Sequence, residues 1–443
     1  MDWNKLLSTK RFGLEDYHDP NKKDRTQFQR DYDRLVFSPS FRRLQNKTQV
    51  FPLPGNIFVH NRLTHSLEVS CVGRSLGNNI STLLREKYGN SLTAFADELG
   101  TIVSVGCLAH DMGNPPFGHS GETAISTYFS EGNGLPLKQE YGLTDEQWAD
   151  IIHFEGNANA LRLLTHQFGG HRPGGFVLTY SSIASVVKYP FVAAMIKKLG
   201  KKKFGFFQAE KDTYKKIADE LGIICFEPGH YARHPLVYLV EAADDICYEI
   251  MDLEDAHKLR LLSTEQTIGL MKAFCQPERI DRINSHLEII DDINEKIAYL
   301  RSCVVGVLVG ECTRVFMENE DAILAGAFSG SLIDNMSDQV KAAYKNCQKV
   351  SEKRIYCSRD VADVEIAGYN IIYTLIDRLT QAVFSPEKAY SKQLLNRIPK
   401  QYDFEGKTPY EKLLSVLDYV SSMTDIYALD LYQKITGMSL PQL

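Results

Sequence analysis

Four short segments of this chain place ionisable side chains inside otherwise apolar sequence. HNRLTHSLEVS contributes His65, LAHDMGNPPFGHSGE contributes His110 and Asp111, HFEGNANALRLL contributes Glu155, and EAADDICYEIMDLED contributes Asp244. A buried carboxylate without a partner costs several kcal/mol, so an acid inside an apolar helix needs a cation beside it. The two imidazoles and the carboxylates of Asp111 and Asp244 are suitable ligands for a divalent metal. This mixture of nitrogen and oxygen does not distinguish Mn, Mg, Fe or Zn.

Each proposed ligand also has a simpler interpretation. A histidine at position 65 is more often a hydrogen-bonding residue at a helix end, and the His110–Asp111 pair could be satisfied by backbone groups of the core. Asp244 could lie on a solvated helix face or pair with a lysine or arginine. These simpler interpretations are improbable when taken together, because three separate apolar helices would each have to bury polar groups that have no function. Since 45 and 133 residues separate the segments, only folding can bring them together.

A second pair of ionisable residues follows the His-Asp pair. His119 and Glu122 are three positions apart, so a helix that begins near His119 would place both on one face, with Glu122 orienting the imidazole. Asp244, Tyr248 and Asp252 recur every four residues and would line about 12 Å of one helix stripe. Tyr248 is equally well explained as a core aromatic residue.

The elements that must position these residues are mostly helical by their hydrophobic periodicity. Strand patterns are few and short, at residues 48–51 and 223–226, so we predict a mainly α fold. Without a low-complexity linker, we divide the chain into an N-terminal segment (1–34), a catalytic core (35–260) and a C-terminal helical region packed on the core (261–443). The expected helices cover residues 62–83, 93–113, 144–167, 234–255, 283–304, 360–383 and 409–435.

Composition excludes several classes of protein. The chain has 443 residues, 44% of them hydrophobic, which is ample for a large core, and a net charge of −6 that attracts it to neither nucleic acid nor an anionic membrane. Nine scattered cysteines without a CxxC pair indicate buried thiols in a reducing compartment. Without an apolar signal core or membrane span, we expect a cytoplasmic protein. The run at 201–203, three lysines, is either a solvated loop or a patch for an anionic effector, a nucleotide or single-stranded DNA.

Taken together in their order along the chain, these motifs resemble a known family. An N-terminal His, a His-Asp pair and a distant Asp are similar to the HD superfamily of metal-dependent phosphohydrolases. The combination of FRRLQNKTQVFPL, HNRLTHSLEV, HDMGNPPFGHSGE, FEGNANALRLL, VVKYP and EAADDICYEIMDLED resembles the deoxyguanosine triphosphate triphosphohydrolase family over residues 35–260. The C-terminal third resembles the family much more loosely.

This resemblance implies an HD-domain helical fold with a C-terminal helical lobe, and hydrolysis of dGTP or another dNTP to deoxynucleoside and inorganic triphosphate. It also implies a homo-oligomer, a tetramer or a hexamer. Carried onto the matching positions, it assigns metal ligation to His65, His110, Asp111 and Asp244, a catalytic pair to His119 and Glu122, recognition of the sugar 3′-hydroxyl to Gln49 and Asp252, packing on the deoxyribose to Tyr248, and triphosphate binding to Arg62 and Lys188.

Two other functions compete with this one. A different HD enzyme, a nucleotidase or nucleotide phosphodiesterase, would share the metal site but would not need Gln49, Tyr248 and Asp252. A catalytically silent nucleotide-sensing or nucleic-acid-binding protein would have no use for His119 and Glu122, because a pure sensor transfers no proton. The sequence leaves open the base preference and whether His119 acts as base or acid.

Overall fold

Helices form most of the chain in its computed structural model, which describes residues 1–16, 25–51 and 59–439, and this confirms the predicted mainly α class. The first half contains α1 (Trp3–Leu6), α2 (Gln27–Val36), α3 (Pro39–Arg43), α4 (Arg62–Tyr88), α5 (Leu99–Ala109), α6 (Gly118–Ser130), α7 (Leu137–Glu140), α8 (Asp145–Ile152), α9 (Gly156–Thr165), α10 (Tyr180–Ala184), α11 (Ile196–Leu199) and α12 (Lys211–Leu221).

The second half contains ten further helices after a short antiparallel pair of strands, β1 (Cys225–Glu227) and β2 (His230–Tyr231). The helices are α13 (Pro235–Lys258), α14 (Thr264–Lys272), α15 (Pro277–Ile289), α16 (Ile293–Glu318), α17 (Glu320–Leu324), α18 (Asp338–Arg354), α19 (Arg359–Phe384), α20 (Ala389–Leu395), α21 (Pro409–Ser421) and α22 (Asp425–Thr436).

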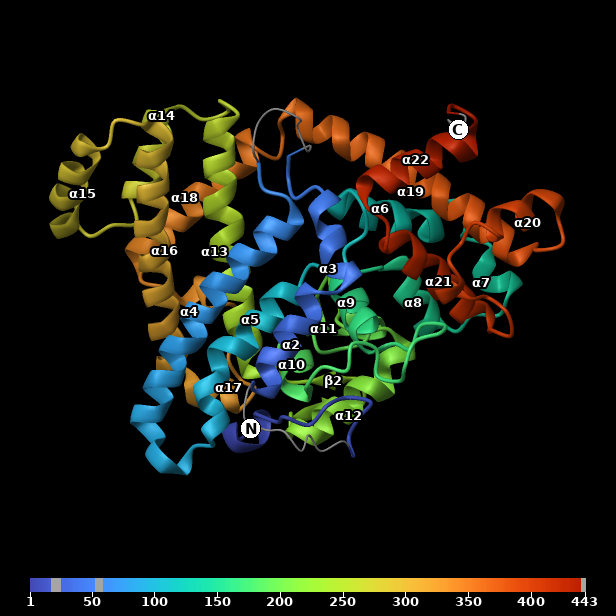
Figure 1. Ribbon diagram of the computed structural model, residues 1–443, viewed down its shortest axis with the longest axis horizontal. Helices are drawn as coiled ribbons and strands as arrows, with labels where there is room; N and C mark the ends of the chain where they lie inside the picture. The colour runs from blue at the N-terminus through green and yellow to red at the C-terminus, as the bar shows by residue number, and fades with distance from the viewer. Residues whose placement is uncertain (17–24, 52–58, 440–443) are drawn as a thin grey trace.

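Helices α4, α5 and α13 pack together, and α16 lies beside α4 and α13 (Figure 1). Nearly every residue of α5 is buried, because the helix is covered by α2, α4 and α13. Gly77 and Gly100 let α4 and α5 approach closely: a Cβ atom on Gly77 would lie 2.7 Å from the Gly100 Cα. This close packing fixes the relative positions of the helices that carry the candidate metal ligands.

Two apolar clusters hold the chain together. The first gathers buried side chains from α4, α5, α13, α16 and α18, and the second gathers those from α6, α8, α19, α21 and α22. Figure 1 shows α19, α21 and α22 grouped at the side of the molecule opposite α14 and α15. The division at residues 34 and 260 stays a prediction, since both clusters combine segments from before and after residue 260.

Three predicted helices are each two helices in the structure. The range 144–167 is divided between α8 and α9, because Glu155 is extended (φ −139°, ψ 127°) and Glu122 Oε1 accepts the Gly156 N–H at 2.8 Å. The range 283–304 is divided between α15 and α16, where Asp292 caps α16. The range 409–435 is divided between α21 and α22, where Thr424 caps α22. Helix periodicity continued across these breaks, so the pattern alone did not reveal them.

Three other predictions differ from the structure in detail. The helix predicted for residues 93–113 is a 3₁₀ turn over Ala94–Glu98 followed by α5, which ends at Ala109 rather than Gly113. Residues 48–51 form no strand and make a single bridge between Thr48 and Asn61. The strand predicted for residues 223–226 is β1, displaced toward the C-terminus. Within the described residues, no helix is long and apolar enough to cross a membrane.

Candidate metal centre and active site

Local signals place each candidate ligand at a helix end or on a helix. Helix α4 begins at Arg62 because the Asn61 side chain accepts the Thr64 N–H at 2.9 Å, which puts His65 in the first turn. His110 ends α5 as its C-cap and Asp111 follows it into the turn. Asp244 lies in the middle of α13. Three helices therefore deliver these side chains to one place.

The structure brings the four predicted ligands together. His65 Nε2 lies 3.2 Å from Asp244 Oδ1, and His110 Nε2 lies 3.4 Å from the same oxygen. Asp111 Oδ1 lies 3.6 Å from His110 Nε2. One potential ligand atom from each of His65, His110 and Asp111 lies within 4.8 Å of the others, so these three groups could hold an ion, with Asp244 contacting both imidazoles.

The orientation of His110 fits a metal ligand. Its Nδ1 donates to the Cys107 carbonyl oxygen at 2.6 Å, which turns Nε2 toward the other candidate ligands. Nε2 is buried and has no hydrogen-bond partner among the described residues. A buried polar atom without a partner is costly unless something completes it. The donor set around Nε2, imidazole and carboxylate, is one that suits a divalent cation.

The pKa shifts of His110 and Asp244 show that the cluster is stabilised by positive charge. Burial opposes protonation of His110, but the carboxylates of Asp111 and Asp244 outweigh it and raise the pKa of His110 to about 9. Burial likewise disfavours the Asp244 carboxylate, yet His110, His65 and Lys188 together hold the pKa of Asp244 well below its ordinary value. A proton on His110 thus supplies positive charge that a bound cation would supply instead.

Two basic residues predicted to hold the triphosphate border the cluster. Buried Arg62 donates from Nη1 to Asp111 Oδ2 at 2.7 Å, and this ion pair helps to hold the pKa of Asp111 below its ordinary value against the opposing effect of burial. The Nε of Arg62 is buried and has no hydrogen-bond partner in the described part of the chain. Lys188 Nζ lies 3.7 Å from Asp244 Oδ2 and 3.6 Å from Glu241 Oε1. Both cations are anchored beside the candidate ligands rather than extended into solvent.

The pair His119–Glu122 lies on α6, which begins at Gly118, so the two side chains share a face as the spacing predicted. His119 Nδ1 and Glu122 Oε2 are 3.5 Å apart, and this interaction is the largest cause that raises the pKa of His119. The His119 side chain is 83% exposed. Helix α6 starts against the metal cluster, because a Cβ atom on Gly118 would lie 2.6 Å from Arg62 Nη2. Among the described residues, neither member of the pair contacts a candidate metal ligand directly.

The predicted sugar-binding residues lie along α13 and beside it. The Tyr248 ring stacks on the Tyr356 ring with centroids 5.9 Å apart. Buried Asp252 accepts the Tyr356 hydroxyl hydrogen at 2.9 Å, and burial raises the pKa of Asp252 well above its ordinary value. Gln49 Oε1 is buried, and no described residue donates a hydrogen bond to it. Sequence analysis did not identify Tyr356, because it follows α18, more than 100 residues from the α13 stripe.

A buried lysine and an aspartate brace the loops of the site and were also missed. Lys47 Nζ donates to the Asn114 carbonyl at 2.6 Å and to the Ser421 carbonyl at 2.8 Å. Asp425 accepts the Thr48 N–H at 2.7 Å and the Phe117 N–H at 2.9 Å. Lys47 lies inside the FRRLQNKTQVFPL motif, so the motif could have identified it as a residue of the site. Nothing in the local sequence distinguished Asp425.

The basic run at 201–203 contributes to the neighbourhood of the site. Lys203 Nζ lies 3.5 Å from Glu155 Oε1, and Glu155 is buried close enough to Glu122 for that acid to raise its pKa, after the larger effect of burial. Lys203 is therefore engaged with an acid of the site, which differs from a freely solvated loop. Glu155 also accepts from Asn157 Nδ2 at 2.5 Å.

Comparison with known proteins extends the match over the whole chain. The phosphohydrolase-associated domain matches residues 335–434. A deoxyguanosinetriphosphate triphosphohydrolase-like protein of Pseudomonas aeruginosa is 37% identical, covering 100% of both chains. A similarly named protein of Synechocystis is 38% identical, covering 99% of this chain and 100% of its own. A deoxyguanosinetriphosphate triphosphohydrolase of Yersinia enterocolitica is 30% identical, covering 98% of this chain and 99% of its own.

Proposed function

Because the chain belongs to the deoxyguanosinetriphosphate triphosphohydrolase family of HD-type phosphohydrolases, we propose that it cleaves dGTP, or a related deoxynucleoside triphosphate, between the 5′ oxygen and the α-phosphorus. The products are a deoxynucleoside and inorganic triphosphate. The observation that carries this proposal is the meeting of His65, His110 and Asp244 at the buried Nε2 of His110, which has no hydrogen-bond partner among the described residues.

The metal-binding role falls to His65, His110, Asp111 and Asp244. Their donor set and the unpartnered Nε2 of His110 support this assignment. A divalent metal held by these residues would supply positive charge beside the α-phosphate and would make a nearby water more acidic. Asn114 Nδ2 donates to Asp111 Oδ1 at 2.5 Å and Arg62 donates to Oδ2, so both oxygens of this ligand are oriented before an ion arrives.

Arg62 and Lys188 bind the phosphate chain. Arg62 retains donors beyond the Nη1 bond to Asp111, because its buried Nε donates to none of the residues that the structure describes. Lys188 lies across the cluster near Asp244, where a point charge can accompany a phosphate oxygen. Charge-assisted hydrogen bonds of this kind hold the leaving triphosphate and fix the α-phosphorus beside the ligand cluster.

His119 and Glu122 move a proton during the reaction. Glu122 is held from two directions, by the Gly156 N–H at Oε1 and by His119 near Oε2, so it can orient the imidazole. The raised pKa of His119 favours the protonated ring. A protonated imidazole can donate its proton to the departing 5′ oxygen, and a neutral one can accept a proton from the attacking water.

The sugar is selected along α13 by three groups. The stacked rings of Tyr248 and Tyr356 leave a flat surface for the deoxyribose, and a ribose 2′-hydroxyl would have to displace one of them. Asp252 and Gln49 offer buried oxygen atoms that can accept the 3′-hydroxyl hydrogen. A site that demands a hydrogen bond rejects a sugar that lacks the donor.

Product analysis tests the reaction. Purified protein is incubated with each dNTP and Mn²⁺ or Mg²⁺, and the products are separated by ion-exchange chromatography. We expect inorganic triphosphate and deoxynucleoside from the wild type, and neither from His110→Ala, which also loses bound metal. Pyrophosphate and nucleoside monophosphate would instead show a pyrophosphohydrolase, and release of orthophosphate a nucleotidase. No turnover of any nucleotide by metal-loaded protein would favour a sensing or nucleic-acid-binding protein.

The assembly and location follow from the same family assignment. We expect a homo-oligomer of four or six copies in the cytoplasm. Light scattering coupled to gel filtration measures the number of copies, and a monomer at micromolar concentration would contradict this part of the proposal.

A further inference from the structure

A buried histidine joins the start of α4 to the last part of α13. His60 precedes Asn61, the N-cap of α4, and its Nδ1–H donates to Asp255 Oδ2 at 2.8 Å. The backbone N–H of His60 donates to the same oxygen, also at 2.8 Å. The other ring nitrogen, Nε2, lies 3.1 Å from Glu68 Oε1 on the second turn of α4. We call the contact between His60 and Asp255 the α4–α13 clamp.

Two carboxylates keep the imidazole of His60 charged. Burial opposes a proton on the ring, but hydrogen bonds to Asp255 and Glu68 outweigh burial and raise the pKa of His60 to about 10. Both ring nitrogens therefore carry hydrogen and donate near neutral pH. A hydrogen bond between charged groups is shorter and stronger than a neutral one, and burial of both side chains removes competing water. The clamp is therefore a firm connection between the two helices.

The clamp lies next to residues with proposed roles on both helices. Arg62 and His65, proposed to bind the phosphates and the metal, follow His60 in the first turn of α4. On α13, Asp255 is three residues after Asp252, so the two carboxylates share a face of the helix. Burial is the largest cause of the raised pKa of Asp252; the Asp255 carboxylate adds to it and the His60 charge opposes it. The clamp is thus close enough to act on the acid that is proposed to recognise the 3′-hydroxyl.

The clamp and the metal cluster join the same two helices at different places. At the metal cluster, His65 Nε2 lies 3.2 Å from Asp244 Oδ1. Asp244 and Asp255 are eleven positions apart on α13, which corresponds to about 16 Å along a helix. A single contact between two helices leaves the angle between them free, whereas two separated contacts fix both the distance and the angle. The start of α4 is therefore held at a set position along the α13 stripe.

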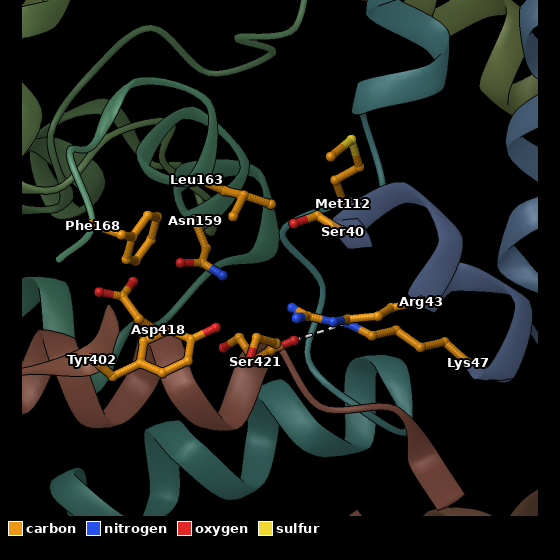
Figure 2. A pocket seen from close by; sticks show the side chains of 11 residues that line it. Ser40, Arg43, Lys47, Met112, Asn159, Leu163, Phe168, Tyr402, Asp418 and Ser421 are labelled. Atoms are coloured by element: carbon orange, nitrogen blue, oxygen red, sulfur yellow. Dashed lines mark hydrogen bonds between the residues drawn. The ribbon is translucent and has the colours of Figure 1, made fainter. Parts of the chain in front are cut away.

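The start of α4 is also connected to the C-terminal helices. The Arg62 N–H donates to the Lys47 carbonyl at 3.2 Å. Lys47 lines a recess of about 20 Å³ and donates from Nζ to the Ser421 carbonyl at the end of α21, at 2.8 Å (Figure 2). Gln49, the second residue proposed to recognise the 3′-hydroxyl, follows Lys47 by two positions. These contacts connect the segment around Gln49 to α21, whereas the clamp connects the start of α4 to α13.

We propose that His60 is a positioning residue for recognition of the 3′-hydroxyl: by holding Asp255, it sets the distance between the phosphate-binding start of α4 and the Asp252 carboxylate. This inference rests on the proposed function, because it requires that Asp252 faces the sugar. His60 itself does not contact the substrate. A small displacement of Asp252 weakens its hydrogen bond to the 3′-hydroxyl, because such bonds depend steeply on distance and direction. The Nδ1 contact with Asp255 carries this role, since the Nε2 contact with Glu68 leads back to α4.

Three variants of His60 separate its two ring contacts. Asparagine places an amide N–H near the position of Nδ1, glutamine places one near the position of Nε2, and alanine removes both; the backbone N–H remains in all three. We expect kcat/KM for dGTP relative to 2′,3′-dideoxyGTP to fall roughly tenfold or more in His60→Gln and His60→Ala, and to stay within about threefold of wild type in His60→Asn. Bound metal, measured by mass spectrometry, should stay near the wild-type content in each variant.

The matched control is His257→Gln, because His257 also lies near the end of α13 and its Nε2 is 3.0 Å from the Thr264 hydroxyl. This variant should keep the wild-type preference for dGTP. A wild-type preference in His60→Gln, or an equal loss in His60→Asn and His60→Gln, would overturn the proposal. The comparison of these two variants decides the matter even if His60→Ala is too unstable to assay, and urea unfolding of each protein identifies that case.

Binding measurements keep this test separate from the proposed reaction. In the background of His119→Ala, which keeps every candidate metal ligand, calorimetric titration gives the dissociation constants of dGTP and 2′,3′-dideoxyGTP for each variant. If the wild type releases no triphosphate, the proposed reaction fails, and a preference for dGTP in binding that His60→Gln loses and His60→Asn keeps still supports the role of His60. Equal binding of the two nucleotides without any substitution at His60 would overturn the inference, whatever the reaction.

Discussion

Hydrogen bonds fix the orientation of the polar side chains in the candidate metal centre and active site. His110 is oriented by the Cys107 carbonyl, Asp111 by Arg62 and Asn114, and Glu122 by the Gly156 N–H. Groups held in this way lose little freedom when a substrate or ion arrives. Individual roles can therefore be separated by substitutions that keep the geometry.

Replacing Glu122 tests the proton-transfer pair. Glu122→Gln keeps an oxygen for the Gly156 N–H but removes the charge beside His119. We expect kcat to fall roughly 100-fold or more, with metal content by mass spectrometry near the wild-type value. Glu365→Gln is the matched control, because Glu365 is an exposed acid near His119 that makes no hydrogen bond to it. Wild-type turnover by Glu122→Gln would remove this residue from the mechanism.

Replacing Tyr248 tests the exclusion of ribose. Tyr248→Ala opens space beside Tyr356. We expect kcat/KM for GTP relative to dGTP to rise by about tenfold or more, because steric exclusion of one added hydroxyl gives discrimination of about this size. Tyr248→Phe keeps the ring and should keep the discrimination. The measurement is the ratio of initial rates for the two nucleotides, and an unchanged ratio in Tyr248→Ala would contradict the assigned role.

Helix α13 is the element on which the site depends most. It carries Asp244, Tyr248 and Asp252 at intervals of four residues, so metal, sugar ring and 3′ end are placed along one stripe. Its start is defined by His234, whose Nδ1 accepts the Leu236 N–H at 3.2 Å, followed by a proline in the first turn. The position of this N-terminus sets the position of the stripe.

The cap of α13 makes stability depend on pH. Burial lowers the pKa of His234 to about 4, below the ordinary value of 6.5, so the native state holds the neutral ring. As the pH falls, the unfolded chain binds a proton at His234 before the native protein does. The contribution of the neutral ring to the free energy of unfolding is therefore complete above pH 6.5 and is lost as the pH falls toward 4. At pH 5 the loss is about 2 kcal/mol in the free energy of unfolding.

Urea unfolding of wild type and His234→Asn at pH 7.5 and pH 5 measures this loss. Asparagine keeps a capping oxygen but does not titrate, so the stability difference between the two proteins should shift in favour of the variant at pH 5. A difference that is equal at both pH values would show that His234 is not responsible.

For the molecule as a whole, the C-terminal helices brace the catalytic loops. Asp425, the first residue of α22, ties Thr48 and Phe117 together, and Lys47 reaches the Ser421 carbonyl at the end of α21. Phe117 has a left-handed backbone (φ 60°), which is unfavourable for a residue with a side chain and persists here because its surroundings hold it. The region that matches the phosphohydrolase-associated domain thus supports the turn before α6.

Asp425→Ala is expected to remove the hydrogen bonds by which α22 supports the loops around Thr48 and Phe117. It leaves two N–H groups without acceptors, which should lower the free energy of unfolding by about 2–4 kcal/mol and reduce kcat while bound metal persists. Asp430→Ala, which removes only a partly exposed pair with Lys434, should change stability by about 0.5 kcal/mol or less. Equal effects of the two substitutions, measured by urea unfolding and initial rates, would contradict the bracing role of Asp425.

Local patterns in the amino-acid sequence were enough to predict the mainly α fold, the helices around residues 62–83, 234–255 and 360–383, and the set of residues that meets at His110. Hydrophobic periodicity is a property of neighbouring residues, and the cost of burying His110, Asp111 or Asp244 holds wherever the helix packs. These features needed no knowledge of which helices touch.

Tertiary structure alone decided the rest. The break before α9, the pairing of Arg62 with Asp111, the contact of Tyr356 with Asp252 and the bracing by Asp425 all join segments tens to hundreds of residues apart. Hydrogen bonds of this kind depend on distance and direction in space, and neither is encoded in the local spacing of residue types.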